Sequence, residues 1–329
     1  MRVLACVLRL ALGGITIMTM ASSSSLAAEL PPVTATADLP IRDPFIVALP
    51  DAKTYLMVGT RKRKAEGPGF DVYVSKDLRQ WETFSAFERP QGFWADRDFW
   101  APEVHRYGGR WYMLATFKAP QVCRGTQILV ADSPRGPFSP HSDGPVTPRD
   151  WECLDGTLHV DDAGAPWIVF CHEWLQVHDG EICASRLDPD LKRAADKPVL
   201  LFHASDAPWP TKKKDMVTDG PFLHRAKNGH LLLLWSSFGR GGYNLGVARS
   251  ASGKVTGPWT HDPEPLYRGD GGHGMLFRTF DGQLTLALHA PNGGGKERAR
   301  FIPVREEDGR LIVVKQQSRD SLIAKEEQR

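Results

Sequence analysis

The chain has 329 residues, of which 41% are hydrophobic and 24% are charged, and its formal net charge is +2. This is a globular composition, long enough for one large domain or two ordinary ones. The 31 Gly, 25 Pro and 10 Trp residues favour a β-rich fold with many turns. A nearly neutral chain argues against a nucleic-acid partner and against binding to an anionic membrane.

The first residues resemble an export signal rather than part of the fold. Arg2 and Arg9 precede an apolar run over 10–21, and Ser25-Leu26-Ala27 provides a small-x-small cleavage site. The apolar run is too short for a membrane span. We therefore predict a secretory signal peptide over 1–27 and a periplasmic or extracellular protein.

Four cysteines remain after the predicted signal: Cys123, Cys153, Cys171 and Cys183. An even number in an exported chain is compatible with one or two disulfides, and buried free thiols are an equally open alternative. The absence of a CxxC pair in the sequence argues against a zinc site.

Five segments of the chain share one layout. Each has a leading polar or small residue, an apolar run, a polar turn and a second apolar run, which is a hairpin signature. A third strand and often a weaker fourth strand follow. The segments start 54 to 64 residues apart, at Asp43, Ala101, Asp155, Asp219 and His273. Four strands per repeat at such a period is typical of propeller blades.

We therefore predict an all-β fold, a five-bladed β-propeller over 41–316 with four antiparallel strands per blade. A lead-in over 28–40 precedes it, and a polar tail over 317–329 follows. Helical periodicity is lacking in the sequence, which excludes α/β barrels and doubly wound sheets. The alternative is two stacked β-sandwich domains, although these would not need a repeated polar residue at each first strand.

The first strand of a propeller blade lines the central channel, so its leading residues should meet at one end of the axis. Carboxylates that meet in one pocket repel one another, which drives their pKa values apart and provides an acid and a base. This is what glycoside hydrolysis needs, although a single Asp before a strand is usually only a turn residue. The residues expected at the axis are Asp43, Glu103, Asp155, Asp219 and His273.

Aromatic residues near these positions can stack on the faces of sugar rings, although such residues more often belong to the core. The aromatic candidates are Phe45, Trp94, Trp100, Trp174, Phe222 and Trp235.

At these segments the chain resembles glycoside hydrolase family 43, over about Ile41 to Val314. The resemblance rests on "RDPFI", "FWAPEVHRYGGRWYMLAT", "LDGTLHVDDAGAPWIVF", "DGPFLHR" and "GGHGMLF". It implies that Asp43 is the general base, that Asp155 orients the acid and tunes its pKa, and that Asp219 is the general acid. It also implies that His273 lies near the axis, in some members beside a metal ion, and that Trp100 and Glu103 shape the pocket.

The chain departs from the family pattern at the acid. Family members usually have Glu where this chain has Asp219, and a carboxyl that is one methylene shorter sits about 1 Å further back, which is a costly displacement. Asp219 is the acid in a tighter pocket, or Glu173 of the "CHEW" segment takes that role. A third alternative is a sugar-binding propeller with weak or no turnover.

The resemblance implies an inverting glycoside hydrolase that acts on plant cell-wall carbohydrate, with α-L-arabinofuranosyl linkages favoured and β-D-xylosides or β-D-galactofuranosides as alternatives. No cofactor is required, although the resemblance leaves room for a Ca2+ ion in the central channel near His273. We expect a monomer with a carbohydrate substrate and no membrane partner. The expected substrate-binding residues are Phe45, Trp100, Glu103, Trp174, Phe222, Ser237 and His273.

Overall fold

The computed structural model describes residues 31–61 and 68–314. The predicted secretory signal over 1–27 and the predicted tail over 317–329 lie outside these residues. The regular secondary structure of this part is almost entirely β-strand, with one short α-helix, α1 (Trp174–Val177), and one 3-10 turn, η1 (Ala204–Asp206). None of its helices is long and apolar enough to cross a bilayer.

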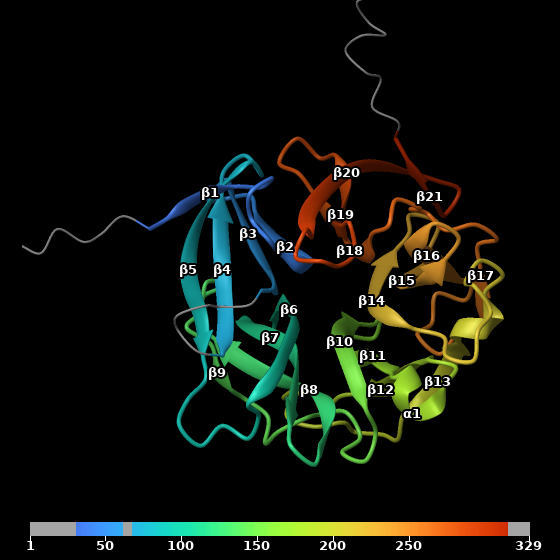
Figure 1. The fold of residues 1–329 in the computed structure, drawn as a ribbon, viewed down its shortest axis with the longest axis horizontal. Coiled ribbons are helices and arrows are strands. Elements are labelled where there is room, and N and C mark those ends of the chain that lie inside the picture. Colours follow the sequence, from blue (N-terminus) through green and yellow to red (C-terminus); the bar gives the residue numbers. More distant parts are fainter. Residues whose placement is uncertain (1–30, 62–67, 315–329) are drawn as a thin grey trace, which may run out of the picture. The chain divides into compact units, whose positions relative to one another are not determined.

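The strands form five antiparallel sheets, which are the five blades of a β-propeller (Figure 1). The first blade contains β1 (Val33–Ala35), β2 (Arg42–Leu49), β3 (Thr54–Thr60), β4 (Gly69–Ser75) and β5 (Gln80–Glu88). The second contains β6 (Arg97–Tyr107), β7 (Arg110–Ala119), β8 (Val122–Ala131) and β9 (Ser139–Pro140).

The other three blades follow in chain order, each with four strands. The third contains β10 (Cys153–Val160), β11 (Pro166–His172), β12 (Glu181–Arg186) and β13 (Val199–His203). The fourth contains β14 (Asp219–Arg225), β15 (Leu231–Gly239), β16 (Gly242–Ser250) and β17 (Trp259–His261). The fifth contains β18 (Gly272–Arg278), β19 (Leu284–Ala290), β20 (Arg298–Glu307) and β21 (Arg310–Val313).

The predicted five-bladed propeller is confirmed, with one addition in the first blade. Its sheet has the order β1-β5-β4-β3-β2, so β1 from the predicted lead-in adds a fifth, outermost strand. In each blade the first strand of the predicted repeat is innermost, which in the first blade is β2. These first strands, β2, β6, β10, β14 and β18, contact one another around the axis (Figure 1).

The hydrophobic core lies between neighbouring blades. One cluster joins blades three and four, another joins blades two and three, and a third joins blades four and five. The second strands are the most deeply buried, and all four leucines from Leu231 to Leu234 are 0% exposed. This burial on both faces explains their almost wholly apolar sequence.

The four cysteines Cys123, Cys153, Cys171 and Cys183 are all free thiols. Three of them are buried and Cys123 is half-buried. The alternative of free thiols, and not that of disulfides, therefore holds in this part of the chain.

Each innermost strand has a β-bulge near its start, where one residue takes a left-handed backbone conformation. The residues at this point are Asp43, Ala101, Asp155, Gly220 and His273, with φ values of 54°, 42°, 56°, 54° and 51°. A bulge of this kind redirects a side chain relative to the regular ladder. Among the five bulge residues, Asp43, Asp155 and His273 come together, with Nδ1 of His273 3.2 Å from Asp43 Oδ1 and 3.6 Å from Asp155 Oδ2.

The bulges also join the blades through hydrogen bonds from their backbone N–H groups. Ala101 N–H donates to Thr60 Oγ1 at 2.7 Å, and Asp155 N–H donates to Thr116 Oγ1 at 2.9 Å. His273 N–H donates to Ser236 Oγ at 2.8 Å. In each pair the acceptor belongs to the preceding blade, so a buried donor is satisfied across every such boundary.

The first and fifth blades are joined by the same kind of hydrogen bond. None of the five sheets combines strands from both ends of the described chain, so the ring is not closed by a shared sheet. Asp43 N–H donates to Nδ1 of His289 in the fifth blade at 3.1 Å. Ile41 N–H donates to the Glu297 carbonyl at 3.1 Å, and Arg42 forms an ion pair with the Glu297 carboxylate at 3.1 Å.

Candidate active site

Asp43 lies at the axis with both carboxylate oxygens engaged. Thr60 Oγ1 donates to its Oδ2 at 2.6 Å, while Nδ1 of His273 and Nδ1 of His289 lie 3.2 Å and 3.3 Å from its Oδ1. Burial on its own would raise the pKa of Asp43. The nearby His273 and His289 and the Arg42 charge outweigh it, so the pKa lies below its ordinary value. Asp43 is therefore an ionised carboxylate over the neutral range.

Asp155 contacts the backbone of the strand that carries Asp219. Its Oδ2 accepts a hydrogen bond from Gly220 N–H at 3.0 Å and lies 3.6 Å from Nδ1 of His273. Burial, together with the charge of Asp43, raises the pKa of Asp155 well above its ordinary value. Asp155 thus fixes the position of the residue next to Asp219 and couples electrostatically to Asp43.

Asp219 begins β14 and is partly buried. Tyr243 in β16 donates its hydroxyl to Asp219 Oδ2 at 2.9 Å. Burial and the negative charge of Asp155 raise the pKa of Asp219 to about 7, against the opposing effects of His273 and the Tyr243 hydrogen bond. A carboxyl with this pKa carries a proton below neutral pH and can release it, as a general acid must.

The register of Asp219 differs from the prediction by one residue. In the first blade the ladder runs from Arg42–Thr60 to Phe45–Val58, with the bulge between them. In the fourth blade it runs from Asp219–Ser236 to Phe222–Leu234.

Asp219 therefore corresponds to Arg42, and Gly220 corresponds to Asp43 and Asp155. Glu103 lies two residues after its bulge residue, Ala101. The predicted segment starts are therefore equivalent positions except at Asp219, because Asp155-Gly156 and Asp219-Gly220 look alike in sequence while their bulges fall at different residues.

Glu173, the alternative acid, lies at the end of the third blade's second strand and forms an ion pair with Arg124 Nη1. Arg124 also donates to Asp98 Oδ2, at 3.1 Å and 2.9 Å, and its guanidinium lies 4.7 Å from the centre of the Trp100 ring. Burial raises the pKa of Glu173 to about 7; the Arg124 charge opposes this shift and the Asp219 charge adds to it. Glu173 is thus held by a cation, at electrostatic range from Asp219.

The predicted substrate-binding residues occupy several different environments. Phe45 is 7% exposed and packs against His105 and Phe222, with ring centres 4.9 Å and 6.2 Å apart, so it belongs to the core lining of the channel. Glu103 is buried, 2.8 Å from Nε2 of His105. Trp100, half-buried, stacks under Arg124.

Two other predicted contacts lie on neighbouring blades. Trp174 is half-buried and begins α1, directly after Glu173. Ser237 is 1% exposed and pairs with Asn244 in the fourth blade, next to Ser236. Their contacts with a substrate stay predictions.

Four residues that sequence reasoning missed are important here: Thr60, Tyr243, His289 and Arg124. None stands in a motif, and each reaches the site from a strand other than the first of its blade. Phe238 was also missed. It is 43% exposed at the end of β15, with its ring centre 5.3 Å from that of Tyr243. An exposed aromatic ring beside the partner of Asp219 provides a surface on which a sugar can stack.

A calcium site was also expected near His273. Within the described residues, no group of three or more His, Cys, Asp or Glu side chains is arranged to hold a metal ion. Calcium takes six to eight oxygen ligands, whereas His273 offers nitrogen, and Asp43 and Asp155 are engaged by Thr60 and Gly220. These residues do not form a calcium cage, so the ion stays a prediction and no step below involves it.

Comparisons with known proteins show what this chain is similar to. A solved endo-arabinase from Bacteroides thetaiotaomicron VPI-5482 is 42% identical, with a TM-score of 0.78 over 86% of this chain and 99% of that chain. An extracellular exo-α-(1→5)-L-arabinofuranosidase of Cellvibrio japonicus (strain Ueda107) is 26% identical over 264 residues, 68% of this chain and 73% of that protein.

A third relative shares the fold. A solved endo-1,4-β-xylanase from Bacteroides thetaiotaomicron VPI-5482 is 24% identical, with a TM-score of 0.73 over 87% of this chain and 97% of that chain. Residues 36–306 match the family described as glycosyl hydrolases family 43. Because this match spans most of the chain, the protein belongs to glycosyl hydrolases family 43 and is a glycoside hydrolase.

Proposed function

We propose that this glycoside hydrolase is exported and cleaves α-L-arabinofuranosyl linkages in plant cell-wall carbohydrate by single displacement with inversion. The observation that carries the proposal is that two carboxyl groups at the axis, those of Asp43 and Asp219, have opposite environments. The pKa of Asp43 is lowered by its neighbours, whereas burial raises the pKa of Asp219 to about 7. Two such carboxyls provide a base and an acid at the same pH.

In this mechanism Asp43 takes a proton from water, and the water oxygen attacks the anomeric carbon. Asp219 gives its proton to the leaving glycosidic oxygen on the opposite side of the sugar. Asp155 holds Gly220 N–H and thereby positions Asp219, while its own negative charge, when present, favours the protonated form of Asp219. Tyr243 orients the Asp219 carboxyl.

The preference for arabinofuranosyl substrates rests on the relatives. The endo-arabinase and the exo-α-(1→5)-L-arabinofuranosidase carry arabinose-directed activities in their names, and the second is extracellular. The predicted signal peptide supports export.

The acid assignment is tested with two leaving groups, an activated aryl arabinofuranoside and a linear α-1,5-arabino-oligosaccharide. Asp219→Ala should lower kcat/KM on the oligosaccharide by about 10²- to 10⁴-fold and much less on the aryl substrate, which needs no protonation. Asp43→Asn should lose both activities. Glu173→Gln should reduce both by the same factor, because Glu173 is ion-paired with Arg124.

The outcome that contradicts this assignment is a loss confined to the oligosaccharide for Glu173→Gln, with Asp219→Ala fully active. In that case Glu173 is the acid. If Asp43→Asn retains activity on both substrates, the single-displacement mechanism itself fails.

A further inference from the structure

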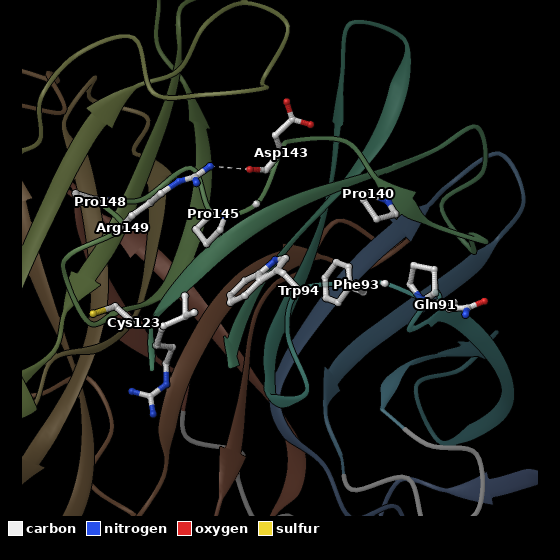
Figure 2. Close-up of a pocket in the computed structure, with 14 residues that line it drawn as sticks. Gln91, Phe93, Trp94, Cys123, Pro140, Asp143, Pro145, Pro148 and Arg149 are labelled. Carbon is white, nitrogen blue, oxygen red and sulfur yellow. Dashed lines mark hydrogen bonds between the residues drawn. The ribbon is translucent and has the colours of Figure 1, made fainter. Parts of the chain in front are cut away.

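A pocket separate from the axial carboxylates opens beside the second blade. Its volume is ≈ 540 Å³, and it lies between the loop 90–94, the start of β8 and the segment 140–149 (Figure 2). Asp43, Asp155 and Asp219 do not line it. Its size falls in the range of about 300–1,000 Å³ that is usual for sites of small ligands.

Trp94 lies at the centre of the pocket lining (Figure 2). Contacts with the protein interior hold its ring in place. Its indole N–H donates to Gln127 Oε1 at 2.6 Å, and Gln127 Nε2 donates to the Ser142 carbonyl at 2.7 Å. The ring packs against Phe93 and Phe117, with ring centres 6.2 Å and 6.4 Å away. The indole is therefore fixed, with its polar atom satisfied, and it remains half-exposed.

Polar groups lie among the apolar lining of the pocket. Arg149 Nη2 donates to the Asp143 carbonyl at 2.8 Å, which holds the guanidinium there and leaves other donors available (Figure 2). The exposed Gln91 adds an amide to the lining. A fixed aromatic ring suits the C–H face of a sugar, and the polar groups around it suit its hydroxyls.

Arg124 connects this pocket to the catalytic centre. It lines the pocket and also forms the ion pair with Glu173, whose charge acts on Asp219 in turn. The pocket and the acid are thus separated by a short chain of side chains. A ligand that occupies both places at once must be extended, as an oligosaccharide is.

We propose that the Trp94 pocket is a remote sugar subsite, which binds residues of an extended neutral oligosaccharide while another residue of the same chain lies at Asp43. The identity of the sugar rests on the proposed function. Binding at such a subsite adds affinity for long substrates without changing the chemistry of the bond that is broken.

Calorimetric titration of the Asp43→Asn variant with a linear α-1,5-arabino-oligosaccharide tests the proposal without turnover. Adding Trp94→Ala should weaken the Kd by at least about tenfold, which corresponds to about 1.4 kcal/mol. In the otherwise wild-type enzyme, Trp94→Ala should raise KM for the oligosaccharide by a similar factor at unchanged kcat. The kinetics on an aryl arabinofuranoside, which is too short to reach the pocket, should stay the same.

Phe280→Ala is the matched control, since Phe280 is an aromatic residue, 37% exposed, that does not line this pocket. It should leave oligosaccharide affinity unchanged. Val122→Lys is a second probe, because Val122 lines the pocket and is 42% exposed, so a longer side chain there fills the pocket without disturbing the core. It should weaken binding as Trp94→Ala does, and it decides the question if Trp94→Ala fails to fold.

The proposal is overturned if both pocket variants bind the oligosaccharide as tightly as their parent, if the parent does not bind it, or if they impair the aryl substrate equally. Failure of the proposed function looks different. The oligosaccharide would then bind to the Asp43→Asn variant in a Trp94-dependent way, while the wild type would not hydrolyse it.

Discussion

At the scale of single residues, three aspartates at one axis differ because their neighbours differ. Asp43 has imidazoles and a guanidinium around it, Asp155 has a single backbone N–H and the charge of Asp43, and Asp219 has a tyrosine hydroxyl. In the proposed mechanism the same side chain therefore serves as base, modulator and acid. These roles follow from burial, charge and hydrogen bonding at each position.

The hydroxyl of Tyr243 should set the alkaline limb of the pH profile. It stabilises the ionised form of Asp219, so Tyr243→Phe removes a stabilising hydrogen bond and raises the pKa of the acid from about 7. The fall of kcat/KM at alkaline pH should move upward by about half to one pH unit. The measurement is the pH dependence of kcat/KM on an arabino-oligosaccharide.

Tyr267→Phe is the control for this shift, since the Tyr267 hydroxyl donates a long hydrogen bond to the Gly269 carbonyl, at 3.5 Å, and not to Asp219. It should leave the profile unchanged. An alkaline limb that stays in place in Tyr243→Phe would show that a group other than Asp219 sets it.

Sequence reasoning identified part of the site at this scale. Asp43 and Asp155 were predictable because each opens an innermost strand in a repeated context. Tyr243 and Arg124 were not, since they reach the axis from outer strands and stand in no motif. The position of Asp219 relative to its bulge depends on backbone conformation, which two similar Asp-Gly pairs do not reveal.

At the scale of elements, the bulge and its hydrogen bond build the site. Each bulge N–H finds an acceptor on the second strand of the preceding blade, except in the fourth blade. There the position that matches Thr60 and Thr116 is Cys171, whose thiol is a weak acceptor. Gly220 N–H donates to Asp155 Oδ2 instead, and this hydrogen bond brings Asp155 against the strand that carries Asp219.

Thr116→Val should test the hydrogen bonds by which side chains of one blade accept from the bulge N–H groups of the next. The change keeps the shape of a fully buried side chain but leaves Asp155 N–H without its acceptor. We expect a loss of about 1–3 kcal/mol in the free energy of unfolding, together with reduced kcat. Urea denaturation measures the loss, and Thr260→Val on an outer strand should cost much less. Equal stabilities of the two variants would argue against the acceptor role.

Gly220→Ala should abolish most activity. A Cβ at Gly220 would lie 2.6 Å from Cγ of His273, and the residue has φ of 54°. The added methyl must therefore displace His273, which contacts Asp43 and Asp155. Gly229→Ala is a matched control, because Gly229 also has positive φ, at 86°, but nothing within 4 Å of its Cβ position.

Both glycine variants carry backbone strain, and only Gly220→Ala carries the clash. Steady-state activity and thermal denaturation of the pair separate the two effects. Similar activity in both variants would mean that the packing of Gly220 on His273 does not matter for catalysis.

The repeated hairpins were predictable because second strands buried on both faces leave a strong apolar pattern. The exception is β1, whose three residues are too few to show a period. The predicted segment starts fall within two residues of the starts of β2, β10, β14 and β18 and within four residues of the start of β6, whereas the bulges were not predictable.

At the scale of the whole molecule, the buried carboxyls make stability depend on pH. The folded-state pKa of Asp219 is about 7, above its ordinary value of 3.8, so this group stabilises the fold fully at low pH. That contribution is lost as pH rises from about 4 through 7. The free energy of unfolding of Asp219→Asn, relative to that of the wild type, should therefore be higher at pH 8 than at pH 4 by at least about 1 kcal/mol.

Chemical denaturation of both proteins at the two pH values measures this difference. A relative stability that is the same at pH 4 and pH 8 would mean that Asp219 titrates normally in the folded state, and the acid assignment would lose its physical basis.

The central claim is that water activated by Asp43 displaces the leaving group directly, with Asp219 as the acid. It is tested most directly by ¹H NMR of the first sugar released from an aryl α-L-arabinofuranoside, recorded before mutarotation. Single displacement predicts that β-L-arabinofuranose appears first. Initial release of the α-anomer would show retention and would contradict the mechanism.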